Sequence, residues 1–322
     1  MIEQALILAA GQGTRLGTLT PDRTKSMLPV LGKPIMVRVM DRMREAGIRR
    51  FVVVIGAEEG ELASYLSNSW YPNIEVQYVL QAVPKGPVDA MLLAENYLEG
   101  AFVVAAGDNL TAPEHVPALL AAFDQGDYAG VLSVIPYEDN ATAPVAVVED
   151  DDRCVKAIVS SPYTGSEPVS ALYLLHAFRP EFSPYLKQVR PAARGERDLT
   201  DAIRLFVEDG NRVGFLGATG YHSLFTEHDL MVVNTSSLDE GRDAHILSEL
   251  PNGVTIHPPV RIDPGVRVGN YATIGPYVYL EHGCTVGEGA QLASTIVLRN
   301  SAVAPGETCQ DVIIMREKRI PV

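Results

Sequence analysis

Apolar and amphipathic stretches alternate along the first half of the chain. Five short apolar runs have the length of buried strands, and they cover residues 5–8, 51–55, 74–79, 101–106 and 129–135. Two stretches between them, residues 34–46 and 87–98, have the apolar spacing of helices, and each begins with a proline. This alternation predicts a mostly parallel sheet covered by helices on both faces. Ligands of such sheets bind beyond the carboxyl ends of the strands.

The tail has a different period. Aliphatic side chains recur there at every sixth position, namely Ile256, Ile262, Val268, Ile274, Leu280, Val286, Leu292 and Leu298, with Ala304 next. Neither a helix nor a simple strand has a period of six. A left-handed parallel β-helix has it, because each short strand presents one aliphatic residue inward and three strands close one coil. Nine hexads predict about three coils.

The two patterns divide the chain. A length of 322 residues is enough for two domains. We expect an α/β domain over residues 1–235, a charged helical linker over residues 236–252 and a short left-handed parallel β-helix over residues 253–322.

Composition limits the classes of partner and the compartment. A net charge of −14 argues against nonspecific binding to nucleic acid or to anionic membranes. We expect no membrane span and no signal peptide, since no apolar run approaches about 20 residues and the first residues are not basic. The three cysteines, Cys154, Cys284 and Cys309, fit neither a disulfide framework nor zinc spacing. A reducing cytoplasm is the expected location.

A glycine-rich loop follows the first predicted strand. It reads GQGTR at residues 11–15, and Lys25 comes ten positions after Arg15. Glycines let backbone N–H groups turn toward an anion without a Cβ in the way. Arg15 offers a planar fork of donors for phosphate oxygens, and Lys25 offers a point charge. Together they suit a nucleoside triphosphate.

Two common phosphate-binding motifs do not match this loop. The dinucleotide motif needs a third glycine where the chain has Leu16, and it needs an acidic residue about 20 positions later. The Walker loop needs Ser or Thr after Gly32 and Lys33, but Pro34 follows. Both motifs are therefore excluded by spacing.

The stretch nevertheless resembles a known signature. GQGTRL at residues 11–16, LPV at 28–30 and GKP at 32–34 are similar to the signature of the nucleoside-diphosphate-sugar pyrophosphorylases, or sugar-1-phosphate nucleotidylyltransferases. Thr24 stands where that family usually has proline. The resemblance implies a Rossmann-like α/β domain. It also implies a set of nucleotide-binding residues, which are Ala9, Ala10, Gly11, Gly13, Thr14, Arg15, Lys25, Gln81, Gly86 and Asp108.

Asp108 is the candidate metal ligand. It lies in a Gly-Asp-Asn turn after the apolar run that ends at residue 106. Taken alone, an aspartate in such a turn is more often a turn-former. Phosphoryl chemistry on a triphosphate needs Mg²⁺, which prefers carboxylate and phosphate oxygens. The resemblance implies that Asp108 binds this metal.

Gln81 and Gly86 suggest a site for the base. A glutamine amide can donate to and accept from a pyrimidine edge, and a glycine lets the base lie flat against backbone. The alternative is an ordinary polar loop. Thymidylyl- and uridylyltransferases have a similar glutamine with a glycine five residues later, which favours UTP or dTTP over purine nucleotides.

The sugar side departs from the family pattern. Ala146 stands in place of a glycine, Ser160 and Ser161 in place of Glu-Lys, and Ser170 in place of Asn or Thr. The second metal-binding aspartate falls in the region of Ser223. Serines can bind a sugar but supply no charge. Lys156, Arg194 and Arg197 are nearby cations that could substitute.

The predicted reaction is Mg²⁺-dependent transfer of a nucleotidyl group from UTP or dTTP to a sugar 1-phosphate similar to glucose 1-phosphate, with release of pyrophosphate. Arg15 would hold the leaving pyrophosphate, Lys25 would neutralise charge at the α-phosphate, and Asp108 would hold Mg²⁺. Two alternatives stay open. One is a weakly active or inactive regulatory paralogue that binds nucleotide or nucleotide-sugar, and the other is transfer to a non-hexose phosphorylated acceptor.

The predicted β-helix suggests assembly. Flat strand faces bury best against a neighbour, so we expect a homo-oligomer, trimer or tetramer, formed through the tail. His257 and His282 could suggest an acyltransferase base. Three coils are too few for an acyl-CoA cleft, and both histidines are predicted to lie in surface turns.

Overall fold

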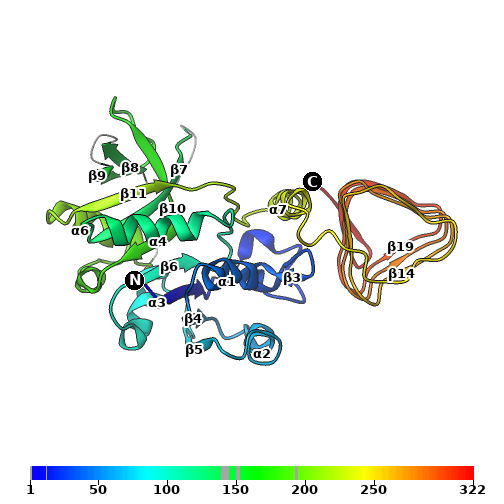
Figure 1. Ribbon diagram of the computed structural model, residues 1–322, viewed down its shortest axis with the longest axis horizontal. Coiled ribbons are helices and arrows are strands. Elements are labelled where there is room, and N and C mark those ends of the chain that lie inside the picture. The colour runs from blue at the N-terminus through cyan, green and yellow to red at the C-terminus, as the bar shows by residue number, and fades with distance from the viewer. Residues whose placement is uncertain (1, 12, 139–144, 150–152, 193–194) are drawn as a thin grey trace. The chain divides into compact units, whose positions relative to one another are not determined.

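The fold is organised around a mixed β-sheet and a stack of short parallel strands (Figure 1). The computed structural model describes residues 2–11, 13–138, 145–149, 153–192 and 195–322. Unit 1 comprises Met1–Gln12 and Met36–His222, and unit 2 comprises Gly13–Ile35 and Ser223–Val322. The segment Gly13–Ile35, here called the signature segment, therefore folds with the tail. This grouping differs from the division at residues 235 and 252 that the sequence suggested.

Unit 1 contains a sheet in the order β5-β4-β1-β6-β10-β7-β11-β9-β8. Its strands are β1 (Gln4–Ala9), β4 (Arg50–Ile55), β5 (Glu75–Leu80), β6 (Phe102–Ala106), β7 (Gly130–Pro136), β8 (Val145–Glu149), β9 (Cys154–Val159), β10 (Val169–Phe178) and β11 (Val213–Gly217). The first four strands in that order are parallel, as predicted. Beyond β6 the sheet is mixed, because β10 runs antiparallel to both β6 and β7.

Helices cover both faces of this sheet. They are α1 (Ile35–Glu45), α2 (Gly60–Ser69), α3 (Pro87–Ala94), α4 (His115–Gln125), α5 (Ser183–Leu186) and α6 (Leu199–Glu208). On one face, Met91 of α3 and Phe206 of α6 share a core with Leu6 of β1. On the other face, His115 of α4 bonds to Ser133, which alternates with the core residue Leu132 along β7. The predicted helices at residues 34–46 and 87–98 are confirmed as α1 and α3.

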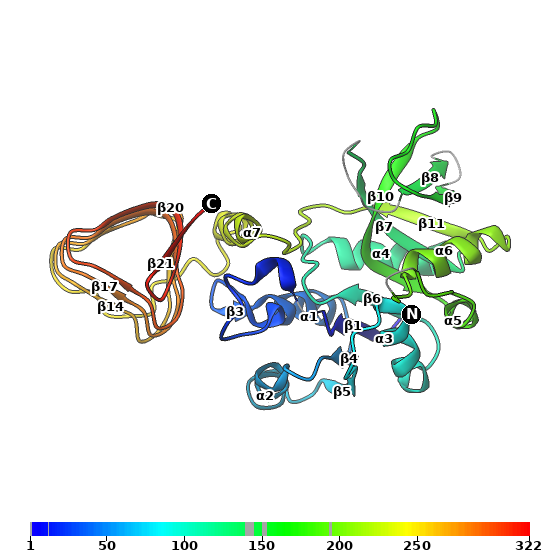
Figure 2. The ribbon, with the colours of Figure 1, turned by 180° about the vertical axis from the view of Figure 1, so that it is seen from behind.

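The tail of unit 2 forms triangular coils of short parallel strands, which we call the coil stack (residues 255–315) (Figures 1 and 2). Its strands are β12 (Thr255–Ile256), β13 (Val260–Ile262), β14 (Arg267–Val268), β15 (Thr273–Ile274), β16 (Val278–Leu280), β17 (Thr285–Val286), β18 (Gln291–Val297), β19 (Ala302–Val303) and β20 (Thr308–Met315). Thr255 pairs in parallel with Thr273, eighteen residues or three hexads later. The aliphatic side chains of the hexads form its core.

The period of six slips by one residue in the third coil. Leu280 pairs with Val297, and Val286 pairs with Val303, so these steps are seventeen residues long. The strict period placed Leu298 and Ala304 at these positions instead. Ala304 is exposed, whereas Val303 is buried. The prediction is wrong from this point because the third coil is one residue shorter.

The region before the coil stack is helical only at its start. Helix α7 (Glu227–Asp239) begins with a capping box between Thr226 and Asp229. Residues 240–252 contain no helix, since Gly241 and Pro251 interrupt them, so the helical linker predicted there is wrong. Ile246 instead pairs with Ile262 beside β13.

A terminal hairpin and the state of the cysteines complete the description. Strand β21 (Lys318–Pro321) pairs antiparallel with β20 and covers that edge of the stack. Cys154, Cys284 and Cys309 form no disulfide bond among the described residues. In the part of the chain that the structure describes, no helix is long and apolar enough to cross a membrane.

Candidate functional site

The carboxyl ends of β1 and β6 bring predicted residues together in unit 1. Leu8 pairs with Ala106, and the Gly107 amide donates to the Leu8 carbonyl at 3.0 Å. Ala9 and Ala10 therefore lie beside the turn that carries Asp108. Gly107 is closely packed, because a Cβ there would lie 3.3 Å from Met36 Cγ and 3.5 Å from the Cβ of Ala9.

Asn109 holds the turn that carries Asp108. It is buried, its amide donates to the Ala106 carbonyl at 3.2 Å, and its side chain donates to the Leu174 carbonyl at 3.1 Å. Asp108 itself is half-buried. The sequence analysis assigned no role to Asn109, although a polar residue directly after the aspartate was a visible signal.

The donor atoms near Asp108 fit only one mode of Mg²⁺ binding. Among the described residues no group of three or more His, Cys, Asp and Glu side chains could hold a metal. Mg²⁺ in nucleotide sites commonly uses one or two carboxylates together with substrate phosphates and water. One carboxylate at a strand end suits that arrangement, whereas an all-protein cage does not fit these residues.

Gln81 and Gly86 contact one another at the end of β5. The Gln81 side chain is buried and its Nε2 donates to the Gly86 carbonyl at 3.3 Å. Gly86 has φ +90°, and a Cβ there would lie 2.7 Å from the Arg197 carbonyl oxygen. Packing against the backbone of Arg197 is thus enough to require a glycine at this position. This requirement could not be seen in the sequence.

The strand order spaces these candidates along one edge. Gln81 follows β5, Gly56 follows β4, Ala10 follows β1 and Asp108 follows β6, and these four strands are adjacent and parallel. Three strand spacings of about 4.8 Å separate the two ends of the array, or roughly 14 Å. The base and the phosphates of one nucleotide can lie along such an edge.

The sugar-side candidates lie on neighbouring strands of the same sheet. Ala146 of β8 pairs with Ser170 of β10. Ser161 follows β9, and its Oγ lies 3.3 Å from the hydroxyl of Tyr137, which follows β7. Ser160 is exposed. Tyr137 was missed by the sequence analysis, since nothing in the sequence pairs residues 137 and 161.

Two of the three cations considered as substitutes belong to the part of the chain that the structure describes. Lys156 is exposed on β9. The Arg197 guanidinium lies 3.8 Å from the Asp89 carboxylate at the start of α3. Arg194 lies outside the described residues.

Gly13, Arg15 and Lys25, which the sequence predicted to bind phosphate, lie in unit 2. Gly13 adopts the left-handed conformation (φ 58°) before a 3₁₀ helix, η1 (Thr14–Leu16). A Cβ on Gly13 would lie 3.0 Å from the Cβ of Lys25, which begins a second 3₁₀ helix, η2 (Lys25–Met27). The structure therefore brings the loop and Lys25 into contact. Gly11, in unit 1, is exposed.

The ring of Phe225 lies close to both Arg15 and Lys25. Its ring centroid lies 4.8 Å from the Arg15 guanidinium carbon and 5.3 Å from Lys25 Nζ. The Phe225 side chain is 46% exposed, and its amide donates to Asp229 at the start of α7. An aromatic face attracts cations and so offsets the repulsion between two of them. The sequence contains no signal that links Phe225 to residues 15 and 25. Ser223, the predicted second metal position, is half-buried in the same unit.

Two buried histidines of unit 1 are not part of these arrays. His115 Nε2 lies 2.9 Å from Ser133 Oγ, and the Ser133 amide donates to His176 Nδ1 at 3.2 Å. Burial lowers the pKa of His176 to about 3, and burial also lowers the pKa of His115. Both rings are therefore uncharged at neutral pH, and they pack as neutral groups in the core.

Comparison with known proteins decides the family. A family model described as Nucleotidyl transferase matches residues 4–222, more than half of the chain. The chain belongs to the nucleotidyl transferase family. It is an enzyme of that kind, as the signature predicted. A second model, described as the GMPPB C-terminal domain, matches residues 256–321 of the tail.

Individual nucleotidyltransferases are similar over much of their length. The glucose-1-phosphate thymidylyltransferase of Streptomyces griseus is 27% identical over 98% of this chain and 93% of that protein. The UTP–glucose-1-phosphate uridylyltransferase AglF of Haloferax volcanii is 28% identical over 68% of this chain and 89% of that protein. The crystal structure of apo UDP-glucose pyrophosphorylase shares the fold, with a TM-score of 0.69 and 20% identity over 75% of this chain and 100% of that one.

Proposed function

We propose that the protein transfers a nucleotidyl group from UTP or dTTP to a sugar 1-phosphate similar to glucose 1-phosphate, releasing pyrophosphate. Two observations carry the proposal. In one unit Gly13 packs against Lys25, and Arg15 and Lys25 lie near the Phe225 ring. In the other unit the candidates from Gln81 to Asp108 follow adjacent parallel strands. The names of the relatives, a thymidylyltransferase and a uridylyltransferase that use glucose 1-phosphate, support the substrate classes.

The reaction needs positioning and neutralisation more than a general base. The attacking phosphate oxygen of the sugar phosphate is already an anion, so no proton must be removed before it attacks the α-phosphorus. Arg15 binds oxygens of the leaving pyrophosphate with its planar fork. Lys25 stabilises the negative charge that develops around the α-phosphate.

Asp108 would hold Mg²⁺ together with the phosphates of the nucleotide. The metal, when bound, neutralises phosphate charge and helps to align the leaving group. Ser223, which the sequence places at the family's second metal position, would offer only a neutral hydroxyl, a weaker ligand for a hard cation than a carboxylate.

The base is selected at Gln81. Its Nε2 is held by the Gly86 carbonyl, which orients the side-chain amide at the strand end. An oriented amide offers one donor and one acceptor edge, and this matches the paired polar groups of uracil and thymine.

The acceptor is bound with hydroxyls in place of charges. Ser161 and Ser170, with Ala146 and Ser160 beside them, form the acceptor side of the site. Because these residues supply no cation to the sugar phosphate, ground-state binding of the acceptor is weak and its KM is high.

The tail assembles the protein as a homo-oligomer. The coil stack is a left-handed β-helix in this proposal, and its flat outer faces pack against those of a second copy. Light scattering of the full chain at micromolar concentration tests this, and a monomer would contradict it.

Pyrophosphate release tests the reaction itself. The full chain is assayed with each of four NTPs against a panel of sugar 1-phosphates, with and without Mg²⁺. We expect activity with UTP or dTTP that requires Mg²⁺. Tight nucleotide binding without turnover on any acceptor would contradict the proposal and indicate a regulatory paralogue. Turnover with a non-hexose phosphate alone would redirect the assignment of the acceptor.

A further inference from the structure

The signature segment has little structure of its own. Its regular elements are η1, η2 and a hairpin of two-residue strands, β2 (Pro29–Val30) and β3 (Lys33–Pro34). Such short elements supply few backbone hydrogen bonds, so the position of Lys25 depends on contacts with other parts of unit 2.

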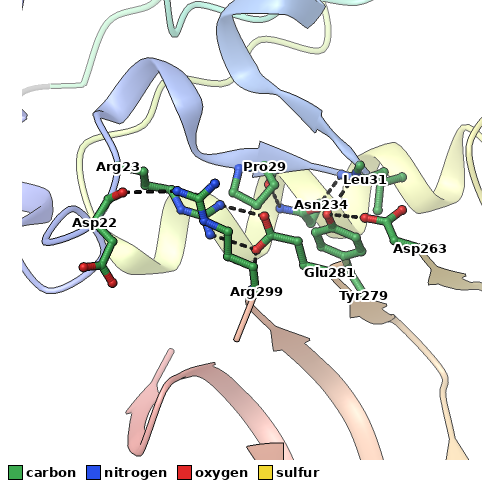
Figure 3. A network of polar contacts seen from close by, with 10 residues as sticks. Asp22, Arg23, Pro29, Leu31, Asn234, Asp263, Tyr279, Glu281 and Arg299 are labelled. Carbon is green, nitrogen blue, oxygen red and sulfur yellow. Dashed lines mark hydrogen bonds and ion pairs between the residues drawn. The ribbon is translucent and has the colours of Figure 1, made fainter. Parts of the chain in front are cut away.

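One anchor lies just before Lys25. The Arg23 guanidinium donates two hydrogen bonds to the Glu281 carboxylate, at 2.7 and 3.1 Å (Figure 3). Glu281 directly follows β16 and also accepts the backbone amide of Arg299 at 2.6 Å. The side chains of Arg23 and Glu281 are 6% and 11% exposed. Arg23 is therefore committed to this pair and is not a phosphate ligand.

A second anchor lies just after Lys25, at the tip of the hairpin. The Gly32 amide donates to the hydroxyl of Tyr279, which donates to Asp263 at 2.9 Å. Asp263 also accepts from Arg261 at 2.7 Å. Gly32 has φ +80°, and a Cβ there would lie 2.7 Å from both Arg261 Nη2 and Asp263 Oδ1.

Helix α7 adds a buried contact to the same hairpin. Asn234, only 1% exposed, accepts the Leu31 amide at 3.0 Å and donates to the Pro29 carbonyl at 3.1 Å. Figure 3 shows both anchors and Asn234 along one side of the signature segment. Side chains of unit 2 thus form hydrogen bonds with residue 23, before Lys25, and with residues 29, 31 and 32, after it.

We propose that the coil stack positions the phosphate-binding loop, with Glu281 acting through Arg23 and Tyr279 acting through Gly32 as positioning residues. This inference rests on the proposed function for the role of Lys25. Phosphoryl transfer is sensitive to small displacements of the charged groups that stabilise it. Loss of an anchor should therefore lower turnover per folded molecule more than it weakens nucleotide binding.

The coil stack offers a matched control for Glu281. Glu307 accepts two bonds from Arg319, at 2.8 and 2.9 Å, and the Ala304 amide at 2.7 Å. It has the same kind of partners as Glu281, but all of them belong to the coil stack and its terminal hairpin. Glu281→Gln and Glu307→Gln remove equivalent charges from the same structure.

The test combines hydrogen exchange with kinetics on the full chain. Glu281→Gln should raise exchange at least tenfold in peptides covering residues 13–35, leave exchange in β1 and β6 unchanged, and lower kcat about tenfold with less than threefold change in the KM for UTP or dTTP. Glu307→Gln should leave both properties unchanged. Equal effects of the two variants, or unaltered exchange in the signature segment of Glu281→Gln, would overturn the inference.

Two further variants keep the test decisive. If Glu281→Gln does not fold, Tyr279→Phe removes only the hydroxyl that binds Gly32, and the same increase in exchange is expected at residues 28–35. Arg23→Gln combined with Glu281→Gln should be no worse than either alone, because the two side chains act as one pair. If the wild type turns over no sugar phosphate, the proposed function fails, and the exchange data still decide whether the coil stack holds the loop.

Discussion

The two units hold their candidate residues by different means. In unit 1, Ala10, Gln81 and Asp108 come within two residues of a strand end, so the backbone ladder of one sheet determines where they lie. In unit 2, Arg15 and Lys25 belong to a segment of very short elements, and its anchors are side chains more than 200 positions later. The first arrangement follows from local sequence, whereas the second depends on distant partners. Changes near Lys25 and changes in the tail should therefore have related effects.

The largest expected effect is that of Lys25→Ala. Loss of a charge that acts mainly in the transition state should lower turnover about a hundredfold, or about 2.7 kcal/mol, with a smaller loss of NTP binding. Steady-state kinetics and calorimetry measure the two quantities. Lys318→Ala, an exposed change in the same unit, is the control. Unchanged turnover in Lys25→Ala would contradict the role proposed for Lys25.

A change at the base site tests the other unit. Gln81→Ala removes a buried amide and its bond to Gly86, so UTP or dTTP should bind about 1–3 kcal/mol more weakly. ATP and GTP binding should change little. Calorimetry with all four nucleotides measures this, and Gln77→Ala, an exposed glutamine of the same strand, is the control. A wild type that prefers ATP would refute the pyrimidine assignment.

As the pH is lowered, unit 1 should begin to lose stability at a higher pH than unit 2. Burial lowers the pKa of His176 to about 3, so the unfolded chain binds more protons below pH 6.5, and stability falls as the pH drops from there. Because His176 stays neutral in the folded protein, the free energy of unfolding falls by up to about 1.4 kcal/mol for each pH unit in this range. In unit 2, a hydrogen bond from Arg319 lowers the pKa of Glu307 to about 2, so its contribution is lost only below about pH 4.5.

Trp70, the single tryptophan of the chain, lies in unit 1 and reports its unfolding. We expect the urea midpoint from Trp70 fluorescence to fall between pH 6.5 and 4.5. The slope should be smaller in His176→Gln and unaltered in His257→Gln, an exposed control. A midpoint that does not change with pH in the wild type would contradict the assignment of a neutral buried His176.

The smallest expected effect is that of removing the Phe225 ring. Phe225→Leu removes the ring that gathers Arg15 and Lys25, and contacts of this kind at exposed sites contribute about 0.5–1 kcal/mol. NTP binding should weaken by about two- to fivefold. Calorimetry compares this variant with Tyr271→Leu, in which an aromatic ring of unit 2 far more exposed than Phe225 is lost. Tighter binding in Phe225→Leu would mean that the ring competes with phosphate for the cations.

The sequence predicted those features that local patterns determine. The apolar runs predicted five of the nine strands in the sheet of unit 1, and prolines marked the starts of two helices. Helix α4 was missed although Val116, Leu119, Leu120 and Phe123 have helical spacing. The slip in the third coil was hidden because Val297 and Leu298 are both aliphatic, so the strict period of six continued to match the sequence.

The sequence could not reveal which unit a residue joins. The glycines at positions 32 and 86 are required by Asp263 and Arg197, which are remote in the chain. Arg23 is only two positions before Lys25, and its buried pairing with Glu281, which distinguishes it from Lys25, has no signal in the sequence. Tertiary contacts of this kind leave no periodic trace in the sequence.

The pairing of Arg23 with Glu281 also affects how the protein is made. The two residues are 258 positions apart. At a synthesis rate of about 5–20 residues per second, Arg23 is synthesised roughly 13 to 50 seconds before Glu281. The segment that carries Lys25 is thus among the first to be synthesised and among the last that can finish folding. A nascent chain that stalls before the second coil would present this segment, with Arg23 lacking its partner, to chaperones and proteases.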